Sequence, residues 1–171
     1  MLEEPVAIEI TEFPLMDTGA PCPLVLADEH RVVLSYLLRD FPDDKLSAIV
    51  SFESVRTHSL GSPSDETQHG HPLWGKGLKH YGVFKIERSP LIHELQRIDS
   101  VHPHHRTDVF QQLNHYIVMM HDSTFECVAR SFHFATSDAY SDQDRAARMI
   151  EGLKANRAGF VPAYKKVRAN V

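Results

Sequence analysis

Short apolar runs and weak alternation of apolar and polar residues mark the first half of the chain, which predicts β-strands. Residues 31–38 carry apolar side chains at both odd and even positions, so we expect this strand to be covered on both faces. It forms a predicted hairpin with residues 24–26 around a turn at residues 27–30. The predicted strands outside the second half are residues 6–10, 24–26, 31–38, 48–55 and 79–86.

After residue 88 the apolar residues follow the period of an α-helix. Ser89 and Pro90 are a typical helix start, with serine as the N-cap and proline in the first turn. A short helix is predicted over residues 107–113, and a longer one begins at the cap residue Ser141 and ends near Gly159. The apolar stripe predicted for the first helix is Leu91, Ile92, Leu95 and Ile98, and that for the last is Ala146, Met149, Ile150 and Leu153.

Strands in hairpins followed by late helices predict an α+β fold. We expect a mainly antiparallel sheet of about six strands, with two to three helices from the second half packed on one face. Residues 1–159 are predicted to form a single domain, and residues 160–171 a basic tail. Residues 57–77, rich in Ser, Gly, Pro and His, are predicted to be a long loop or flap, a feature that is usually functional or disordered.

Residues 115–133 are predicted to be two strands joined by a tight turn, and they hold three of the chain's 12 histidines. The contiguous His121, Asp122 and Ser123 imitate a catalytic triad. Adjacent strand residues point to opposite faces, however, and a triad draws its members from separate elements. Asp and Ser also favour turns, so we interpret this tripeptide as the turn itself.

A two-residue turn at Asp122 and Ser123 and a four-residue loop over residues 121–124 give the same register, in which Met119 faces Glu126. Cys127 then lies on the apolar face as a buried thiol, and His121 shares the other face with Glu126 as its diagonal neighbour, about 7–8 Å away. The apolar face is predicted to carry Tyr116, Val118, Met120, Phe125, Cys127 and Ala129. The opposite face is predicted to carry His115, Ile117, Met119, His121, Thr124, Glu126, Val128 and Arg130.

The pair of His121 and Glu126 is the candidate catalytic site, with His121 as general base or metal ligand and Glu126 setting its pKa. A divalent metal is the candidate cofactor, and it needs a further ligand. The candidates are His104 and His105 of residues 102–105, or a histidine of the loop, His69 or His71. His71 and Trp74 of the 57–77 segment are candidates for contact with a ligand or cofactor. The alternatives are a solvated hairpin tip, histidines at a helix end, and a Trp74 that anchors its loop to the core.

The formal net charge of −5 disfavours nucleic acid as a partner. No segment approaches the roughly 18 apolar residues of a membrane span, and the first residues do not resemble a secretory signal. Two cysteines, Cys22 and Cys127, are too few for a disulfide framework, so we expect a cytoplasmic protein. A small-molecule ligand and a homo-oligomer are both compatible with the sequence.

Two functions follow from these features. The first is a small-molecule or metal-binding domain, with or without catalysis, whose pocket is lined by His121, Glu126 and a histidine from residues 102–105 under the 57–77 segment. The alternative is a protein-interaction domain in which the histidines are solvated surface residues. Convergence of these side chains in one concave site favours the first function, and dispersed histidines beside an apolar patch favour the second.

Overall fold

The computed structural model describes residues 4–39 and 46–155. These residues form two compact units, one from residues 4–11 and 56–131 and the other from residues 12–39, 46–55 and 132–155. The fold is α+β, with antiparallel pairing in both sheets and with its three helices in the second half of the described chain, as predicted. No helix in the described ranges is long and apolar enough to cross a bilayer.

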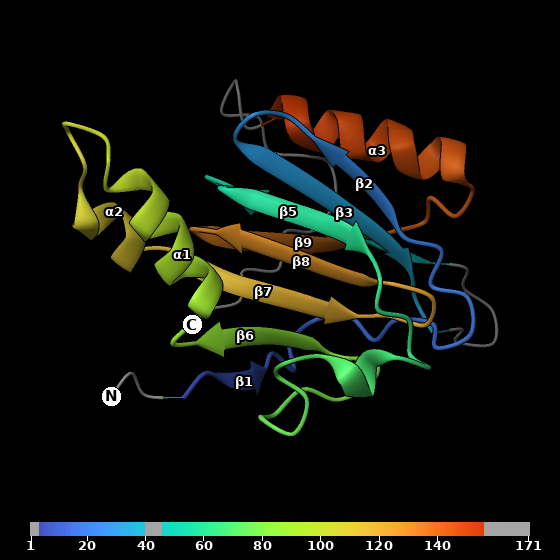
Figure 1. Cartoon of the computed structure of the whole chain (residues 1–171). Helices are drawn as coiled ribbons and strands as arrows, with labels where there is room; N and C mark the ends of the chain where they lie inside the picture. Colours follow the sequence, from blue (N-terminus) through green and yellow to red (C-terminus); the bar gives the residue numbers. More distant parts are fainter. Residues whose placement is uncertain (1–3, 40–45, 156–171) are drawn as a thin grey trace. The chain divides into compact units, whose positions relative to one another are not determined.

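The first unit is built on a five-stranded sheet (Figure 1). Its strand order is β1 (Val6–Glu9), β6 (Val83–Glu87), β7 (Asn114–Met119), β8 (Thr124–Ala129) and β5 (Thr57–Gly61). Neighbouring strands are antiparallel, with Ile117 opposite Glu126 and Ser59 opposite Glu126 on its other side. Glu126 therefore lies on a central part of one sheet face.

Two apolar clusters cover that same face of the first sheet. The first packs Leu73 and Leu78 of the segment before β6 against β-strand side chains that include Ile117 and Met119. The second packs the helices α1 (Pro90–Asp99) and α2 (Thr107–Gln111) against Val128, largely through Phe110. Along β8, Glu126 lies between these clusters, because Thr124, Glu126 and Val128 point to one face.

The second unit is built on a four-stranded sheet. Its strand order is β2 (Leu24–Ala27), β3 (Arg31–Leu37), β4 (Ser47–Glu53) and β9 (Ser131–Ser137). The carboxylate of Asp28 accepts hydrogen bonds from the backbone N–H groups of His30 and Arg31, both at 2.9 Å, which closes the predicted β2–β3 turn. Six consecutive residues of β3 are buried, as its apolar run predicts.

Helix α3 (Asp142–Ala155) lies over β2, β3 and β4 of the second sheet (Figure 1). The hydroxyl of Ser141 accepts the backbone N–H of Asp144 at 3.1 Å, so the predicted cap is confirmed. Met149 is buried against Val33 and Ile49, but Ile150 is 44% exposed. Arg145 of this helix is also fully buried, and its guanidinium donates to Asp142 and to the carbonyl of Cys22. The predicted end at Gly159 and the predicted basic tail lie outside the described residues.

The sheets hold more strands than the predicted six. The segment predicted as one long loop begins with β5, and it also contains a single 3₁₀ turn at Gln68–Gly70. Residues after Arg130 form β9 in the second sheet. Strand β5 is exposed at four of its five positions, and β9 is exposed at Ser131 and Thr136 and partly buried elsewhere except at Phe134 and Ala135, so the apolar pattern of both strands is weak.

Candidate functional site

A continuous chain of hydrogen bonds joins helix α1 to the centre of the first sheet. The hydroxyl of Ser89 accepts the backbone N–H of Ile92 at 3.2 Å and lies 2.7 Å from Nδ1 of His115. On the other side of the imidazole, Nε2 of His115 lies 2.7 Å from Oε1 of Glu126. Three elements, the α1 start, β7 and β8, therefore meet in one polar group on the covered face of the sheet.

Ser89, His115 and Glu126 are the residue types of a Ser-His-carboxylate triad, but the serine is too deeply buried to act as a nucleophile. Ser89 is 3% exposed and His115 is 2% exposed, whereas a nucleophilic hydroxyl must reach a substrate. The Ser89 oxygen also caps the helix, because it accepts an N–H of the first turn. Ser89 therefore orients the imidazole of His115, and His115 orients the carboxylate of Glu126. Glu126 is the residue of the three that reaches solvent, with a side chain that is 34% exposed.

His71 lies close enough to Glu126 and His115 to interact with both electrostatically. Its Nδ1 accepts the backbone N–H of Leu73 at 3.1 Å. Burial lowers the pKa of His71, so the ring is neutral at pH 7. Since a neutral ring that accepts at Nδ1 carries its proton on Nε2, the ring of His71 has an N–H donor at Nε2.

The charge of Glu126 is stabilised in the folded protein. The hydrogen bond from His115 lowers the pKa of Glu126, and burial opposes this shift only in part. The carboxylate is therefore ionised well below neutral pH, and it offers hydrogen-bond acceptors only. This part of the molecule can therefore offer a ligand the carboxylate of Glu126 as an acceptor and the Nε2–H of His71 as a donor.

The predicted register of the central hairpin is wrong by two positions. Met119 faces Thr124 and not Glu126, because the turn falls at His121 and Asp122, closed by the N–H of Met120 and the carbonyl of Ser123 at 3.0 Å. A shift of two positions keeps every strand side chain on its predicted face, and Cys127 is buried, with burial raising its pKa to about 12. It also makes His115, and not His121, the partner of Glu126.

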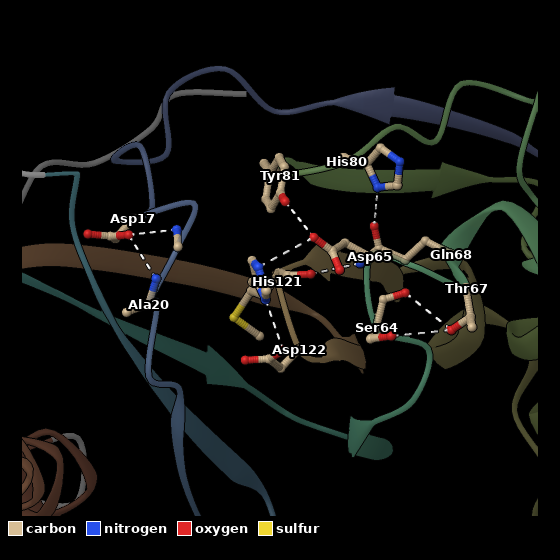
Figure 2. Close-up of polar contacts among 12 residues, drawn as sticks. Asp17, Ala20, Ser64, Asp65, Thr67, Gln68, His80, Tyr81, His121 and Asp122 are labelled. Atoms are coloured by element: carbon tan, nitrogen blue, oxygen red, sulfur yellow. Dashed lines mark hydrogen bonds and ion pairs between the residues drawn. The ribbon is translucent and has the colours of Figure 1, made fainter.

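His121 belongs to a different polar group at the hairpin tip (Figure 2). Its Nε2 lies 3.7 Å from Oδ2 of Asp65, and its Nδ1 lies 2.9 Å from Oδ1 of Asp122. The hydrogen bond with Asp122 raises the pKa of His121. The hydroxyl of Tyr81 donates to the same Asp65 carboxylate at 2.5 Å and lowers its pKa. The proposed catalytic and metal roles of His121 stay predictions, and in the described part of the chain Glu126 pairs with His115 and not with His121.

The segment around Trp74 is tied to the first sheet. The carbonyl of Lys76 accepts the backbone N–H of Ala7 at 2.8 Å, and Leu73 and Leu78 are buried in the adjoining cluster. Trp74 packs against this cluster and against His80, with 4.8 Å between the centroids of the two rings. These contacts favour the anchoring alternative for Trp74, while His71 of the same segment interacts electrostatically with Glu126.

His104 and His105, the predicted further metal ligands, lie in the α1–α2 connection. His105 Nδ1 lies 2.7 Å from Oδ2 of Asp99, and the backbone N–H of His104 donates to Nδ1 of His102. Within residues 4–39 and 46–155, no group of three or more His, Cys, Asp or Glu side chains is arranged to hold a metal ion. The divalent-metal hypothesis therefore has no site among the described residues.

The sequence analysis missed Ser89 and His115 as site residues. Ser89 was correctly assigned as a helix cap, and His115 was correctly placed on the face of Glu126. A histidine at an inward position of a strand that is otherwise apolar is the available signal, since a buried imidazole needs two polar partners. The register error assigned one of those partners to His121.

A pH-dependence of stability follows from the lowered pKa of Glu126. Because the folded-state pKa lies below the value of about 4.3 for an unfolded chain, this stabilisation is present above that value and is lost as the pH falls through the folded-state pKa. In urea unfolding at pH 7 and pH 4, Glu126→Gln is expected to lose less stability between the two pH values than the wild type. Glu29→Gln, at an exposed turn, should keep the wild-type difference. Equal losses in all three proteins would contradict the coupling.

Comparison of the chain with known protein families, curated proteins and solved structures gave no match, so the geometry of this site is the basis for its functional assignment.

Proposed function

We propose that this protein binds a small polar molecule through the carboxylate of Glu126, with the imidazole of His71 as a second contact. The observation that carries this proposal is the hydrogen bond of 2.7 Å from His115, which holds Oε1 of Glu126 while the side chain remains 34% exposed. Such a carboxylate is oriented before a ligand arrives, which reduces the entropy lost on binding.

The donor and acceptor pattern favours an amide-like group as the ligand. Ionised Glu126 only accepts hydrogen bonds, so the ligand must supply an N–H or O–H donor. His71 supplies an N–H, so the ligand also gains from a carbonyl or another acceptor. The apolar clusters on both sides of Glu126 along β8 suit a ligand with an apolar body.

Binding is favoured over catalysis by the direction of the pKa shift. A general base works best when its pKa lies near the working pH, and that of Glu126 is shifted down, away from neutrality. Ser89 and His115 are buried behind Glu126, which favours a positioning role for both. We keep the cytoplasm as the proposed location, because Cys22 and Cys127 are both free thiols.

The proposal is tested with three probes that share a ring and differ in polar group: benzamide, benzylamine and benzoate. In two-dimensional ¹⁵N–¹H NMR titrations, benzamide and benzylamine should shift the backbone amides of Leu73 and Glu126. Benzoate should leave them unchanged, because two carboxylates repel each other. In Glu126→Gln, the benzamide dissociation constant should rise about tenfold, equivalent to about 1.4 kcal/mol.

The matched control is Glu29→Gln, which removes an exposed carboxylate of the second unit and should bind benzamide as the wild type does. Benzoate shifting the Leu73 and Glu126 amides as strongly as benzamide does would refute the donor requirement. Unchanged benzamide affinity in Glu126→Gln would exclude this carboxylate as the anchor.

A further inference from the structure

We propose that the first unit carries a second site, which binds the phosphate group of a small organic phosphate. The site is a cavity of about 210 Å³ beside the α1–α2 connection. Its lining includes Arg56, Asp99, His102, His104, Arg106 and Phe110. Arg56 directly precedes β5, Asp99 ends α1, the two histidines and Arg106 lie in the α1–α2 connection, and Phe110 lies in α2, so donors reach the cavity from several segments.

Arg56 is the cationic side chain best placed to meet an anion. Its backbone N–H donates to the carbonyl of Val128 at 2.8 Å, which fixes the residue beside the sheet. Its guanidinium carbon lies 5.9 Å from the centre of the Phe110 ring. Within residues 4–39 and 46–155 this guanidinium forms no hydrogen bond or ion pair, so its five N–H donors remain for a ligand.

The histidines of the connection add oriented donors. The backbone N–H of His104 donates to Nδ1 of His102 at 3.1 Å, the arrangement also seen between Leu73 and His71. In the neutral ring the proton of His102 is therefore on Nε2. The ring of His104 lies 5.8 Å from that of His102, so both imidazoles belong to one edge of the cavity.

The acidic residues near the cavity are already engaged. Asp99 lies 2.7 Å from Nδ1 of His105 through Oδ2. Asp108 accepts from Nε and Nη2 of Arg106 at 3.1 and 2.5 Å, which leaves Nη1 of Arg106 without a hydrogen-bond partner in the described ranges. The charge left for a ligand is thus chiefly that of Arg56, in a chain whose formal net charge is −5.

Size and donor directions favour a phosphate. The volume is below the roughly 300–1,000 Å³ of sites that enclose drug-sized ligands, so one compact group fits. Phosphate oxygens accept from several directions at once, and arginine recognises them with paired N–H groups. The apolar part of an organic phosphate would lie against Phe110 and Val109.

The experiment is a calorimetric and ³¹P NMR titration of the full chain with phenyl phosphate, inorganic phosphate and benzoate at constant ionic strength. Phenyl phosphate is expected to bind most tightly, inorganic phosphate more weakly because it lacks the ring, and benzoate least. Arg56→Gln should weaken phenyl phosphate binding at least tenfold, and His102→Phe should weaken it severalfold.

Arg97→Gln is the matched control, because Arg97 is exposed on α1 and pairs with Glu94. It should bind phenyl phosphate as the wild type does. Absence of saturable binding, or equal affinity of Arg56→Gln and Arg97→Gln, would overturn the proposal. Inorganic phosphate binding as tightly as phenyl phosphate would overturn the assignment to an organic phosphate. Glu126→Gln should leave this titration unchanged, which separates the second site from the first.

Discussion

Replacing Gly77 with alanine is expected to destabilise the protein by about 2–5 kcal/mol, through backbone strain and overpacking together. Gly77 has a φ angle of +104°, a region that residues with a side chain rarely adopt. A Cβ at this position would lie 2.1 Å from the carbonyl oxygen of Ala7. That backbone is held by β1 pairing and by the hydrogen bond from Ala7 to Lys76, so it cannot move away cheaply.

Two other glycines of the same segment provide graded controls. Gly75 has a φ angle of +79° but no atom within 4 Å of a built Cβ, so Gly75→Ala tests strain alone and should cost about 1–2 kcal/mol. Gly70 has open space and no positive φ, so Gly70→Ala should stay within about 0.5 kcal/mol of the wild type. Urea unfolding should rank the costs Gly77, Gly75, Gly70. A Gly77→Ala protein as stable as Gly70→Ala would refute the close approach of the two backbones.

Gly77→Ala is also expected to affect ligand binding at Glu126. The segment that Gly77 closes carries His71 at one end and anchors Leu73 and Leu78 in the cluster beside Glu126. A segment that detaches from β1 would release His71 from its place near the carboxylate. We therefore expect weaker benzamide binding in Gly77→Ala and unchanged benzamide binding in Gly70→Ala, measured by the same NMR titration.

Replacing His115 with leucine is expected to lower the free energy of unfolding by about 2–4 kcal/mol. The change removes both hydrogen bonds of a buried imidazole, at 2.7 Å to Ser89 and 2.7 Å to Glu126. It leaves the Glu126 carboxylate with no hydrogen-bonding neighbour on β7, and only its 34% exposed surface can be compensated by water. His93→Leu, at an exposed position of α1, is the matched control and should change stability little.

A double-mutant cycle shows whether Ser89 and His115 act as one unit. Ser89→Ala alone should cost about 1–3 kcal/mol, because the helix loses its cap and Nδ1 of His115 loses a buried partner. The double variant should cost clearly less than the sum of the two single variants, with a coupling of about 0.5–3 kcal/mol. Additive costs in urea unfolding would show that the hydrogen bond between them does not contribute to stability.

The local elements were predictable wherever short-range chemistry decides them. Ser89 and Ser141 cap helices as expected, because a serine side chain satisfies an N–H only a few residues away. The faces of the central hairpin follow from the two-residue period of a strand. Each side chain lies on its predicted face although the predicted register was wrong by two positions. Strands β5 and β9 were missed because they depend on pairing partners distant in sequence, and their own apolar patterns are weak.

At the candidate site, the sequence determined the face on which each residue lies but not its hydrogen-bond partners. By itself, the sequence determined that Glu126 lies on one sheet face with His115, that Cys127 lies on the other, and that His-Asp-Ser at residues 121–123 is a turn. Only the tertiary structure decided that Glu126 meets His115 and Ser89, and that His121 meets Asp65. The reason is physical: a turn can shift by one residue on each strand at little local cost, and long-range packing of β6, α1 and the 71–78 segment selects the register.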